Sequence, residues 1–143
     1  MKKFFNSFCF RTAVSLHVCV FHPSLVCNLN CPDCYSASNF NAPKMSLREA
    51  CIALDRLRDN GVRTLIFSGG EPLLYEHIWD VLSYASDLGF SLSMMTNGTL
   101  LDSDAAEALG SFDLRVWISL DYYNERAQRA WRRGGSFRNI FRF

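Results

Sequence analysis

Short apolar runs alternate along the chain with longer stretches in which apolar residues recur every three or four positions. The short runs are rich in β-branched and aromatic residues and predict four buried strands, at residues 14–21, 64–68, 90–96 and 114–120. The longer stretches have the spacing of helices packed by one face, and they lie at residues 47–57, 78–88, 102–110 and, for a turn or two, 124–131.

Several element ends are marked by individual residues. Ser46 and Glu49 form a capping box, in which each side chain satisfies a backbone N–H of the first helical turn. Gly61 is expected to end this helix, and Asp102 can cap the third one. Pro23 is expected to end the first strand. These local features support the boundaries that the periodicity predicts.

Alternating strands and helices with short connections predict an α/β fold with a parallel sheet. In such sheets, ligands bind at the carboxyl ends of the strands. Each predicted strand is followed by glycine, polar or thiol residues, in the order Cys27–Cys34, Gly69–Pro72, Thr96–Gly98 and Ser119–Asp121. Because these ends meet at one edge of a parallel sheet, we expect a single composite site there.

Length and charge narrow the class of protein. A chain of 143 residues with a formal net charge of +1 fits one globular domain without a strong field for nucleic acid or an anionic membrane. We divide it into an N-terminal extension, residues 1–13, and a core domain, residues 14–143. The extension begins with two lysines and aromatic residues, but its apolar run is short and interrupted, so we do not expect a signal peptide. No apolar run reaches the ~20 residues of a membrane span.

The strongest chemical feature is a group of three cysteines, Cys27, Cys31 and Cys34. Thiolates at this spacing can bind one iron–sulfur cluster from a short loop. Three cysteines would leave one iron of a four-iron cluster without a protein ligand, open to a substrate or cofactor. A zinc site completed by His17 or His22 is the alternative.

The other three cysteines have a simpler interpretation. Six cysteines in all could indicate a disulfide framework, but three of them lie within eight residues, which favours ligation. Cys9, Cys19 and Cys51 are expected to be small buried apolar residues, and Cys51 falls on the apolar face of its predicted helix.

The cysteine loop, Gly69-Gly70-Glu71-Pro72, Thr96-Asn97-Gly98 and Ser119-Leu120-Asp121 together resemble the motifs of the radical S-adenosylmethionine (radical SAM) enzymes, in order as well as in residues. The resemblance spans about residues 14 to 140. It implies a partial (βα) barrel of the TIM-like radical SAM type, with about four parallel strands and helices outside. The C-terminal part of such a barrel would be missing.

The resemblance also implies a role for each motif. Cys27, Cys31 and Cys34 would hold a 4Fe-4S cluster whose open iron binds S-adenosylmethionine. The cofactor's methionine amino group would be held by Gly69, Gly70 and Glu71. Its ribose or carboxylate would meet four polar residues, Thr96, Asn97, Ser119 and Asp121. Without the cysteines, these motifs would read as ordinary turns and helix starts.

Two aromatic and basic features complete the expected site. Tyr35 would pack over the cluster or near the adenine, whereas Asp33 occupies the position where many family members carry an aromatic residue or histidine. Arg129, Arg132 and Arg133 are interpreted as a solvated helix end. In the family, an arginine in a segment like 133–137 can contact the cofactor carboxylate.

The implied activity is reductive cleavage of S-adenosylmethionine to a 5′-deoxyadenosyl radical, which abstracts hydrogen from a substrate such as a peptide, a cofactor precursor or another small molecule. A reductant such as flavodoxin or ferredoxin would supply the electron, and an oxygen-labile cluster favours the cytoplasm. The loop is similar to that of peptide-modifying and cofactor-maturing members. The alternatives are a non-enzymatic iron–sulfur or zinc module, and an inert remnant.

The last residues affect how much of this activity to expect from the chain alone. The sequence stops at Phe143, before the further strand–helix units of a radical SAM core. Four strands would leave an open half-barrel with an unpaired edge. We therefore expect a fragment of a longer protein, with a half-domain completed by a partner or a degenerate remnant as alternatives.

Overall fold

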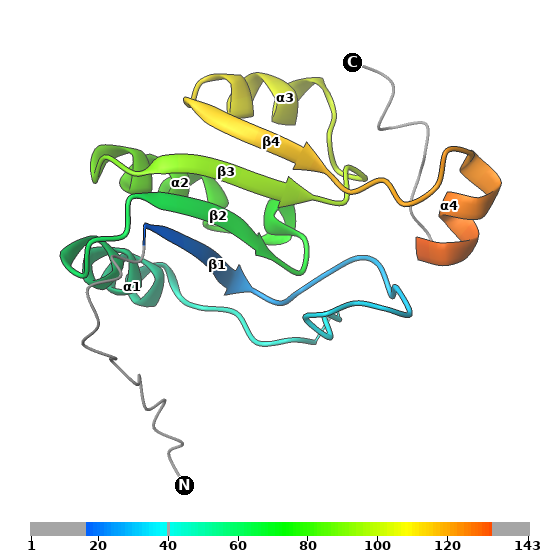
Figure 1. Ribbon diagram of the computed structural model, residues 1–143, viewed down its shortest axis with the longest axis horizontal. Helices are drawn as coiled ribbons and strands as arrows, with labels where there is room; N and C mark the ends of the chain where they lie inside the picture. The colour runs from blue at the N-terminus through cyan, green and yellow to red at the C-terminus, as the bar shows by residue number, and fades with distance from the viewer. Residues whose placement is uncertain (1–16, 40, 133–143) are drawn as a thin grey trace, which may run out of the picture.

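The computed structural model describes residues 17–39 and 41–132, and its centre is a four-stranded parallel sheet (Figure 1). The strands lie side by side in chain order: β1 (Val18–Ser24), β2 (Thr64–Gly69), β3 (Ser91–Thr96) and β4 (Leu114–Ile118). All three pairings are parallel, as expected for strands joined by helical crossovers. The predicted α/β class and the four parallel strands are confirmed.

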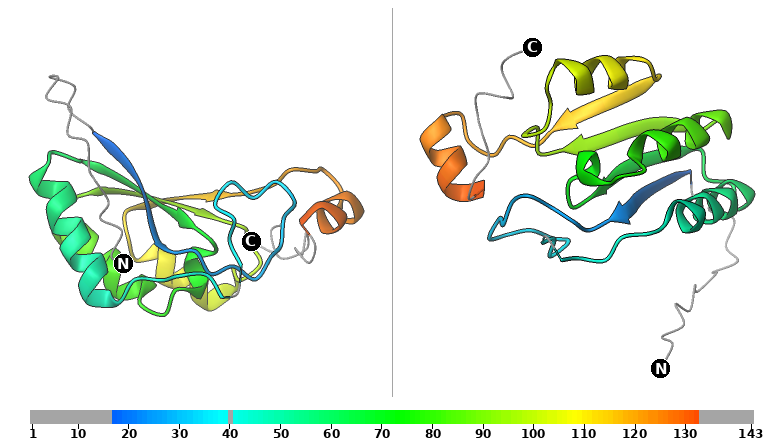
Figure 2. Two further views of the ribbon diagram at one scale, coloured as in Figure 1. Left: turned by 90° about the horizontal axis from the view of Figure 1, so that it is seen from below. Right: turned by 180° about the vertical axis from the view of Figure 1, so that it is seen from behind.

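Helices cover one face of this sheet. They are α1 (Leu47–Asp59), the short 3₁₀ helix η1 (Pro72–Leu74), α2 (Ile78–Asp87) and α3 (Ser103–Gly110). Figure 2 shows α1, α2 and α3 on the same side, whereas α4 (Glu125–Arg132) lies beyond the carboxyl ends of the strands. No helix within residues 17–39 and 41–132 is long and apolar enough to cross a membrane.

The core fills the space between the sheet and these helices. Strand residues alternate between the two faces, so β2 and β3 each send every second side chain toward the helices. The ring of Phe21 packs edge-on against Phe67, with 5.7 Å between ring centroids. The remaining buried apolar side chains of this layer include Leu54, Leu65, Val81, Leu82, Leu92 and Met94.

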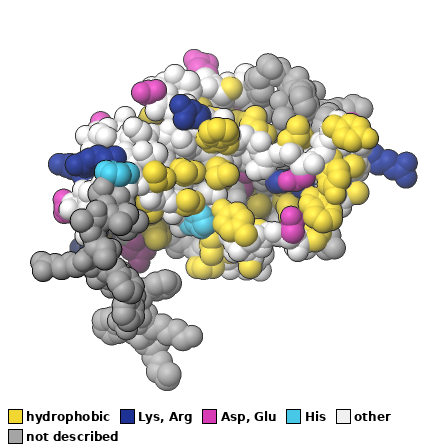
Figure 3. Space-filling model, in the orientation of Figure 1, with side chains coloured by type: hydrophobic (Ala, Val, Ile, Leu, Met, Phe, Trp, Pro, Cys, Tyr) yellow, Lys and Arg dark blue, Asp and Glu magenta, His cyan; other side chains and the backbone are white. Residues whose placement is uncertain are grey.

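The opposite face of the sheet carries several exposed apolar side chains. Figure 3 views this face and shows hydrophobic side chains spread across it. Large exposed hydrophobic residues on it include Val18 and Val20 of β1, Met95 of β3 and Trp117 of β4. This face leads toward the carboxyl ends of the strands, where Met95 borders the cavity described below.

The predicted capping box is present at the start of α1. Ser46 Oγ accepts a hydrogen bond from the backbone N–H of Glu49, and Glu49 Oε2 accepts one from the backbone N–H of Ser46, at 2.8 Å. These bonds lower the pKa of Glu49. The helix ends at Asp59, two residues before Gly61. Asp102 likewise caps α3, as predicted, by accepting from the N–H of Ala105.

Three local predictions are wrong. Pro23 does not end β1, which continues to Ser24. The strand lies at the edge of the sheet, where its pairing with β2 shifts after Phe21, so the missing N–H of proline is tolerated there. β4 ends at Ile118 rather than Leu120. Cys51 is only half-buried, since α1 buries Ala50 and Leu54 instead.

Some predictions concern parts of the chain outside the described residues. These are the start of the first strand before residue 17, the extension 1–13 with Cys9, and the segment from Arg133 onward. Cys19, which is described, packs against the core as expected but is half-buried rather than buried.

Candidate functional site

The loop that carries the cysteines crosses the carboxyl end of β2 in close backbone contact. Gly70 N–H donates to Ser24 O at 3.1 Å, and Glu71 N–H donates to Val26 O at 2.8 Å. A Cβ atom would lie 2.3 Å from Ser24 O at position 69 and 2.0 Å from Val26 O at position 70. The two glycines are therefore required because the cysteine loop leaves no room for a side chain.

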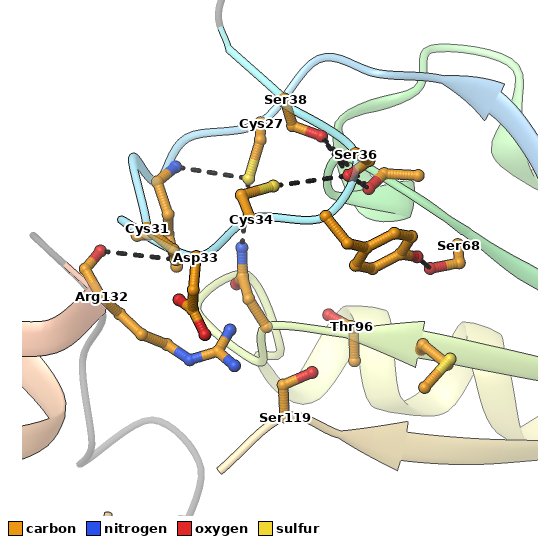
Figure 4. A pocket seen from close by; sticks show the side chains of 16 residues that line it. Cys27, Cys31, Asp33, Cys34, Ser36, Ser38, Ser68, Thr96, Ser119 and Arg132 are labelled. Atoms are coloured by element: carbon orange, nitrogen blue, oxygen red, sulfur yellow. Dashed lines mark hydrogen bonds between the residues drawn. The ribbon is translucent and has the colours of Figure 1, made fainter. Parts of the chain in front are cut away.

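The three cysteines face one cavity of about 200 Å³ at the carboxyl ends of the strands (Figure 4). Cys27 is buried, while Cys31 and Cys34 are half-buried. Burial raises the pKa of the Cys27 and Cys31 thiols. Burial also acts to raise the pKa of Cys34, but hydrogen bonds from Ser36 and Ser38 outweigh it, and this pKa is lowered.

This donor set fits a cluster. Thiols are the ligands that iron–sulfur clusters take in proteins, and these three belong to one cavity wall. In the described part of the chain, no three His, Cys, Asp or Glu side chains converge closely enough to hold a single metal ion. Neither His17 nor His22 lines the cavity. The three thiols of this cavity wall are thus of the ligand type that an iron–sulfur cluster takes.

Tyr35 lies at the edge of this cavity with its ring largely exposed, at 75%. Its hydroxyl lies 2.9 Å from Ser68 Oγ and 3.4 Å from His22 Nε2. Tyr35 therefore joins the cysteine loop to the open face of β1 and β2. Its ring stays available to a ligand.

Glu71 is placed differently from the sequence expectation. It is fully buried and does not belong to the cavity wall, whereas the backbone of Gly69 and Gly70 does. Its carboxylate accepts hydrogen bonds from Thr96 Oγ1 at 2.7 Å, from Asn97 N–H at 2.8 Å and from Leu73 N–H. Burial raises the pKa of Glu71, against the effect of these bonds. The carboxylate thus supports the end of β3 from behind the cavity.

The motif after β4 is divided between the cavity and its surroundings. Ser119 lines the cavity and Asp121 does not. Asp121 instead forms an ion pair with Arg132 of α4. Among the residues that the structure describes, Arg132 is the basic residue that lines the cavity. Its guanidinium faces the site in Figure 4.

Arg132 was missed because the sequence suggested a solvated basic helix end. The buried residue of α4 is Gln128, whose Oε1 accepts from the N–H groups of Asp121 and Tyr122 at 3.1 and 3.0 Å. Arg132 lies four positions later, on the same helix face. The burial of Gln128 depends on its contact with the chain after β4, so the sequence alone carries no signal for Arg132. Arg129, on the other hand, is exposed and pairs with Glu125, as expected of a surface residue.

Three serines in the cavity wall were also missed, namely Ser36, Ser38 and Ser68. Ser36 and Ser38 hydroxyls donate to Gly69 O at 2.7 and 3.2 Å and so connect the cysteine loop to β2. Their spacing immediately after the third cysteine was the available signal.

Comparisons with known proteins agree with this arrangement. A family model described as "Radical SAM superfamily" matches residues 22–143. The AdoMet-dependent heme synthase of Methanosarcina barkeri is 36% identical over 101 residues, which are 68% of this chain and 29% of that protein. The antilisterial bacteriocin subtilosin biosynthesis protein AlbA of Bacillus subtilis is 34% identical over 115 residues, 78% of this chain and 26% of that protein.

Solved structures support the fold. The crystal structure of Streptococcus suis SuiB bound to S-adenosylmethionine matches with a TM-score of 0.70 and 25% identity, over 87% of this chain and 28% of that one. The expected partial barrel is therefore confirmed. The chain spans about a quarter to a third of the length of these relatives.

Proposed function

Because the chain belongs to the radical SAM superfamily, we propose that its cavity binds a 4Fe-4S cluster and S-adenosylmethionine for radical catalysis. The observation that carries this proposal is that three thiols, two glycines, Ser119 and Arg132 border one cavity at the carboxyl ends of four parallel strands. When bound, such a cluster supplies the electron that cleaves S-adenosylmethionine to methionine and a 5′-deoxyadenosyl radical, which takes a hydrogen atom from the substrate.

Each side of the cavity has a role in this proposal. Cys27, Cys31 and Cys34 hold the cluster. The backbone of Gly69 and Gly70 approaches the ligand without side chains in the way and binds the methionine amino group. Glu71 acts indirectly, because its buried carboxylate already accepts three hydrogen bonds from the protein.

Ser119 and Arg132 bind the methionine carboxylate. A guanidinium is the side chain best suited to a planar carboxylate, and Arg132 is held in place by its ion pair with Asp121. This gives Asp121 a positioning role instead of direct contact. Thr96 likewise has a positioning role, because its hydroxyl is already used in donating to Glu71 and accepting from Gly98 N–H. The exposed ring of Tyr35 supports packing against the adenine.

The substrate belongs to the classes on which the relatives act. Their names refer to heme synthesis and to subtilosin biosynthesis, and SuiB has been crystallised with its precursor peptide SuiA. We propose a peptide or a cofactor precursor as substrate, a flavodoxin or ferredoxin as reductant, and the cytoplasm as location. Residues 14–143 would form part of the core domain, with 1–13 as an extension.

Product analysis tests the proposal. Anaerobically reconstituted protein is reduced with dithionite in the presence of S-adenosylmethionine, and 5′-deoxyadenosine and methionine are quantified. Both products should form in the parent chain and in Cys51→Ala, whose thiol lies on α1. Neither product should form in Cys31→Ala, and this variant should also have lost most of the bound iron. Equal product and equal iron in Cys31→Ala would contradict the proposal.

A further inference from the structure

The side-chain amide of Asn97 has a fixed orientation next to Cys27. One end of the amide lies 2.9 Å from the backbone N of Thr99, which can only donate, so this end is the oxygen Oδ1. The Thr99 hydroxyl donates to the same oxygen at 2.6 Å. The nitrogen Nδ2 must therefore point the other way, where it donates to Asn28 Oδ1 at 3.0 Å and to Cys27 Sγ at 3.9 Å.

Cys27 differs from the other two cysteines in the donors around its sulfur. Cys27 Sγ accepts from the backbone N–H of Leu29 at 3.4 Å as well as from Asn97. Cys31 Sγ donates to the carbonyl oxygen of Arg132, and Cys34 has hydrogen bonds with the side chains and backbone N–H groups of Ser36 and Ser38. In the described contacts of the three sulfurs, Cys27 is the one that accepts from a side-chain amide. It is also the most buried of the three cysteines.

The position of Asn97 is itself held by buried groups. Glu71 Oε2 accepts from its backbone N–H at 2.8 Å, and Glu71 is fully buried. Asn28 Nδ2 donates to Thr99 Oγ1 at 2.8 Å, which closes a ring of hydrogen bonds through Asn97. Asn97 is only 8% exposed. An amide held on every side in this way keeps its N–H directed at sulfur without further loss of conformational freedom.

We propose that Asn97 is a positioning residue that sets the reduction potential of the cluster through its N–H···S hydrogen bond to Cys27. The inference rests on the proposed function, because it requires a cluster on Cys27. Hydrogen bonds to ligand sulfurs are among the factors that set iron–sulfur potentials. Such a bond stabilises the more negative, reduced state, because the sulfur gains electron density on reduction. Asn97 thereby makes the cluster easier to reduce.

The test uses two replacements of Asn97 and one matched control. Asn97→Ser keeps a short oxygen that can accept from the Thr99 N–H, as serine does in turns, but it cannot reach Cys27. Asn97→Leu keeps the approximate side-chain volume and removes the donor entirely. Thr99→Val removes the Thr99 hydroxyl from the same hydrogen-bond ring and leaves the Thr99 N–H and the Asn97 amide in place.

Iron content and reduction potential are measured on the full reconstituted chain, the potential by redox titration monitored with electron paramagnetic resonance. Both Asn97 variants should bind as much iron as the parent, with a threefold to tenfold lower equilibrium constant for one-electron reduction. Thr99→Val should stay close to the parent. This readout is independent of catalytic activity.

Two results would overturn the inference. One is an unchanged potential in cluster-loaded Asn97→Ser or Asn97→Leu. The other is loss of the cluster in both variants, which would show that Asn97 holds the loop instead of adjusting the cluster. A parent chain that binds no cluster at all would be a failure of the proposed function itself, and the two failures are therefore distinguishable.

Discussion

The hydroxyl of Thr96 donates to the carboxylate of Glu71 across 2.7 Å and joins the end of β3 to the turn that follows β2. The hydroxyl gives its single hydrogen to the carboxylate, while its oxygen accepts from the N–H of Gly98. Both residues are almost fully buried. The polar motifs after neighbouring strands thus form one connected network, and the cavity is built on it.

Glu71→Gln should destabilise the fold without adding or removing volume. One carboxylate oxygen accepts from Thr96 and Leu73, and the other accepts from the N–H of Asn97. Glutamine must place an NH₂ group against one of these donors, which costs about 1–3 kcal/mol. Urea unfolding measures this loss. Glu76→Gln, at an exposed ion pair with Lys44, should cost less than about 1 kcal/mol. Equal losses would contradict the buried network.

Gly70→Ala should disturb the cysteine loop. The added Cβ would lie 2.0 Å from Val26 O, and a backbone atom cannot move aside as a flexible side chain can. We expect a loss of stability of about 1–3 kcal/mol, as for other overpacked sites, together with reduced iron binding after reconstitution.

Gly110→Ala is the matched control for this change. A Cβ at Gly110, in the last turn of α3, would meet nothing within 4 Å. Alanine there should leave iron binding unchanged and stabilise the helix by up to about 0.5–1 kcal/mol. Full iron binding and full stability in Gly70→Ala would show that the close crossing of the two loops is not required.

Much of the fold follows from local sequence features. The four strands and the helices are predicted by the spacing of apolar residues, and the capping box of Ser46 and Glu49 is fully determined by residues three positions apart. The C-terminal boundaries of β1 and β4 are harder to predict, and the sequence placed them wrongly at Pro23 and Leu120. They depend on pairing with the neighbouring strand, which a single strand's sequence does not contain.

For the site, the sequence predicts which motifs meet but not how their side chains are oriented. Parallel strands bring the four motifs to one edge, as predicted. Whether a motif residue faces the cavity or the protein interior depends on the path of the loops, and for this reason the depth of Glu71 and the ion pair of Asp121 were not foreseen. Arg132 reaches the cavity because Gln128 anchors α4 to the chain after β4, a contact between segments that periodicity alone cannot give.

Stability should depend on pH through Glu49. Its hydrogen bonds from Ser46 lower its pKa below the ordinary value of 4.5. A carboxyl with a folded-state pKa below its unfolded value stabilises the fold above the unfolded pKa, and this contribution is lost as pH falls through the folded pKa. Glu49→Gln retains a capping side chain without the charge.

The free energy of unfolding of the parent and Glu49→Gln should therefore be compared between pH 7 and pH 3. The advantage of the parent should be constant near neutral pH and should shrink as the pH falls below about 4.5. A difference that stays constant down to pH 3 would show that the carboxylate charge has no part in the cap.

Arg132→Met should weaken binding of S-adenosylmethionine while leaving iron content unchanged. The variant keeps an apolar stem and removes the guanidinium that faces the cavity, and hydrogen bonds to charged groups contribute about 1.5–3 kcal/mol, so the dissociation constant should rise about tenfold or more. Arg129→Met, one turn earlier and exposed, should bind as the parent does. Equal dissociation constants in the two variants would remove Arg132 from the site.

The central claim is that the three cysteines hold a cluster with an open iron inside a cofactor cavity. The most direct measurement is electron paramagnetic resonance of the anaerobically reconstituted, dithionite-reduced chain with and without S-adenosylmethionine. The account predicts a reduced-cluster signal whose g-values shift when S-adenosylmethionine is added. A cluster signal that is identical in both samples would contradict it and would favour a non-enzymatic iron–sulfur module.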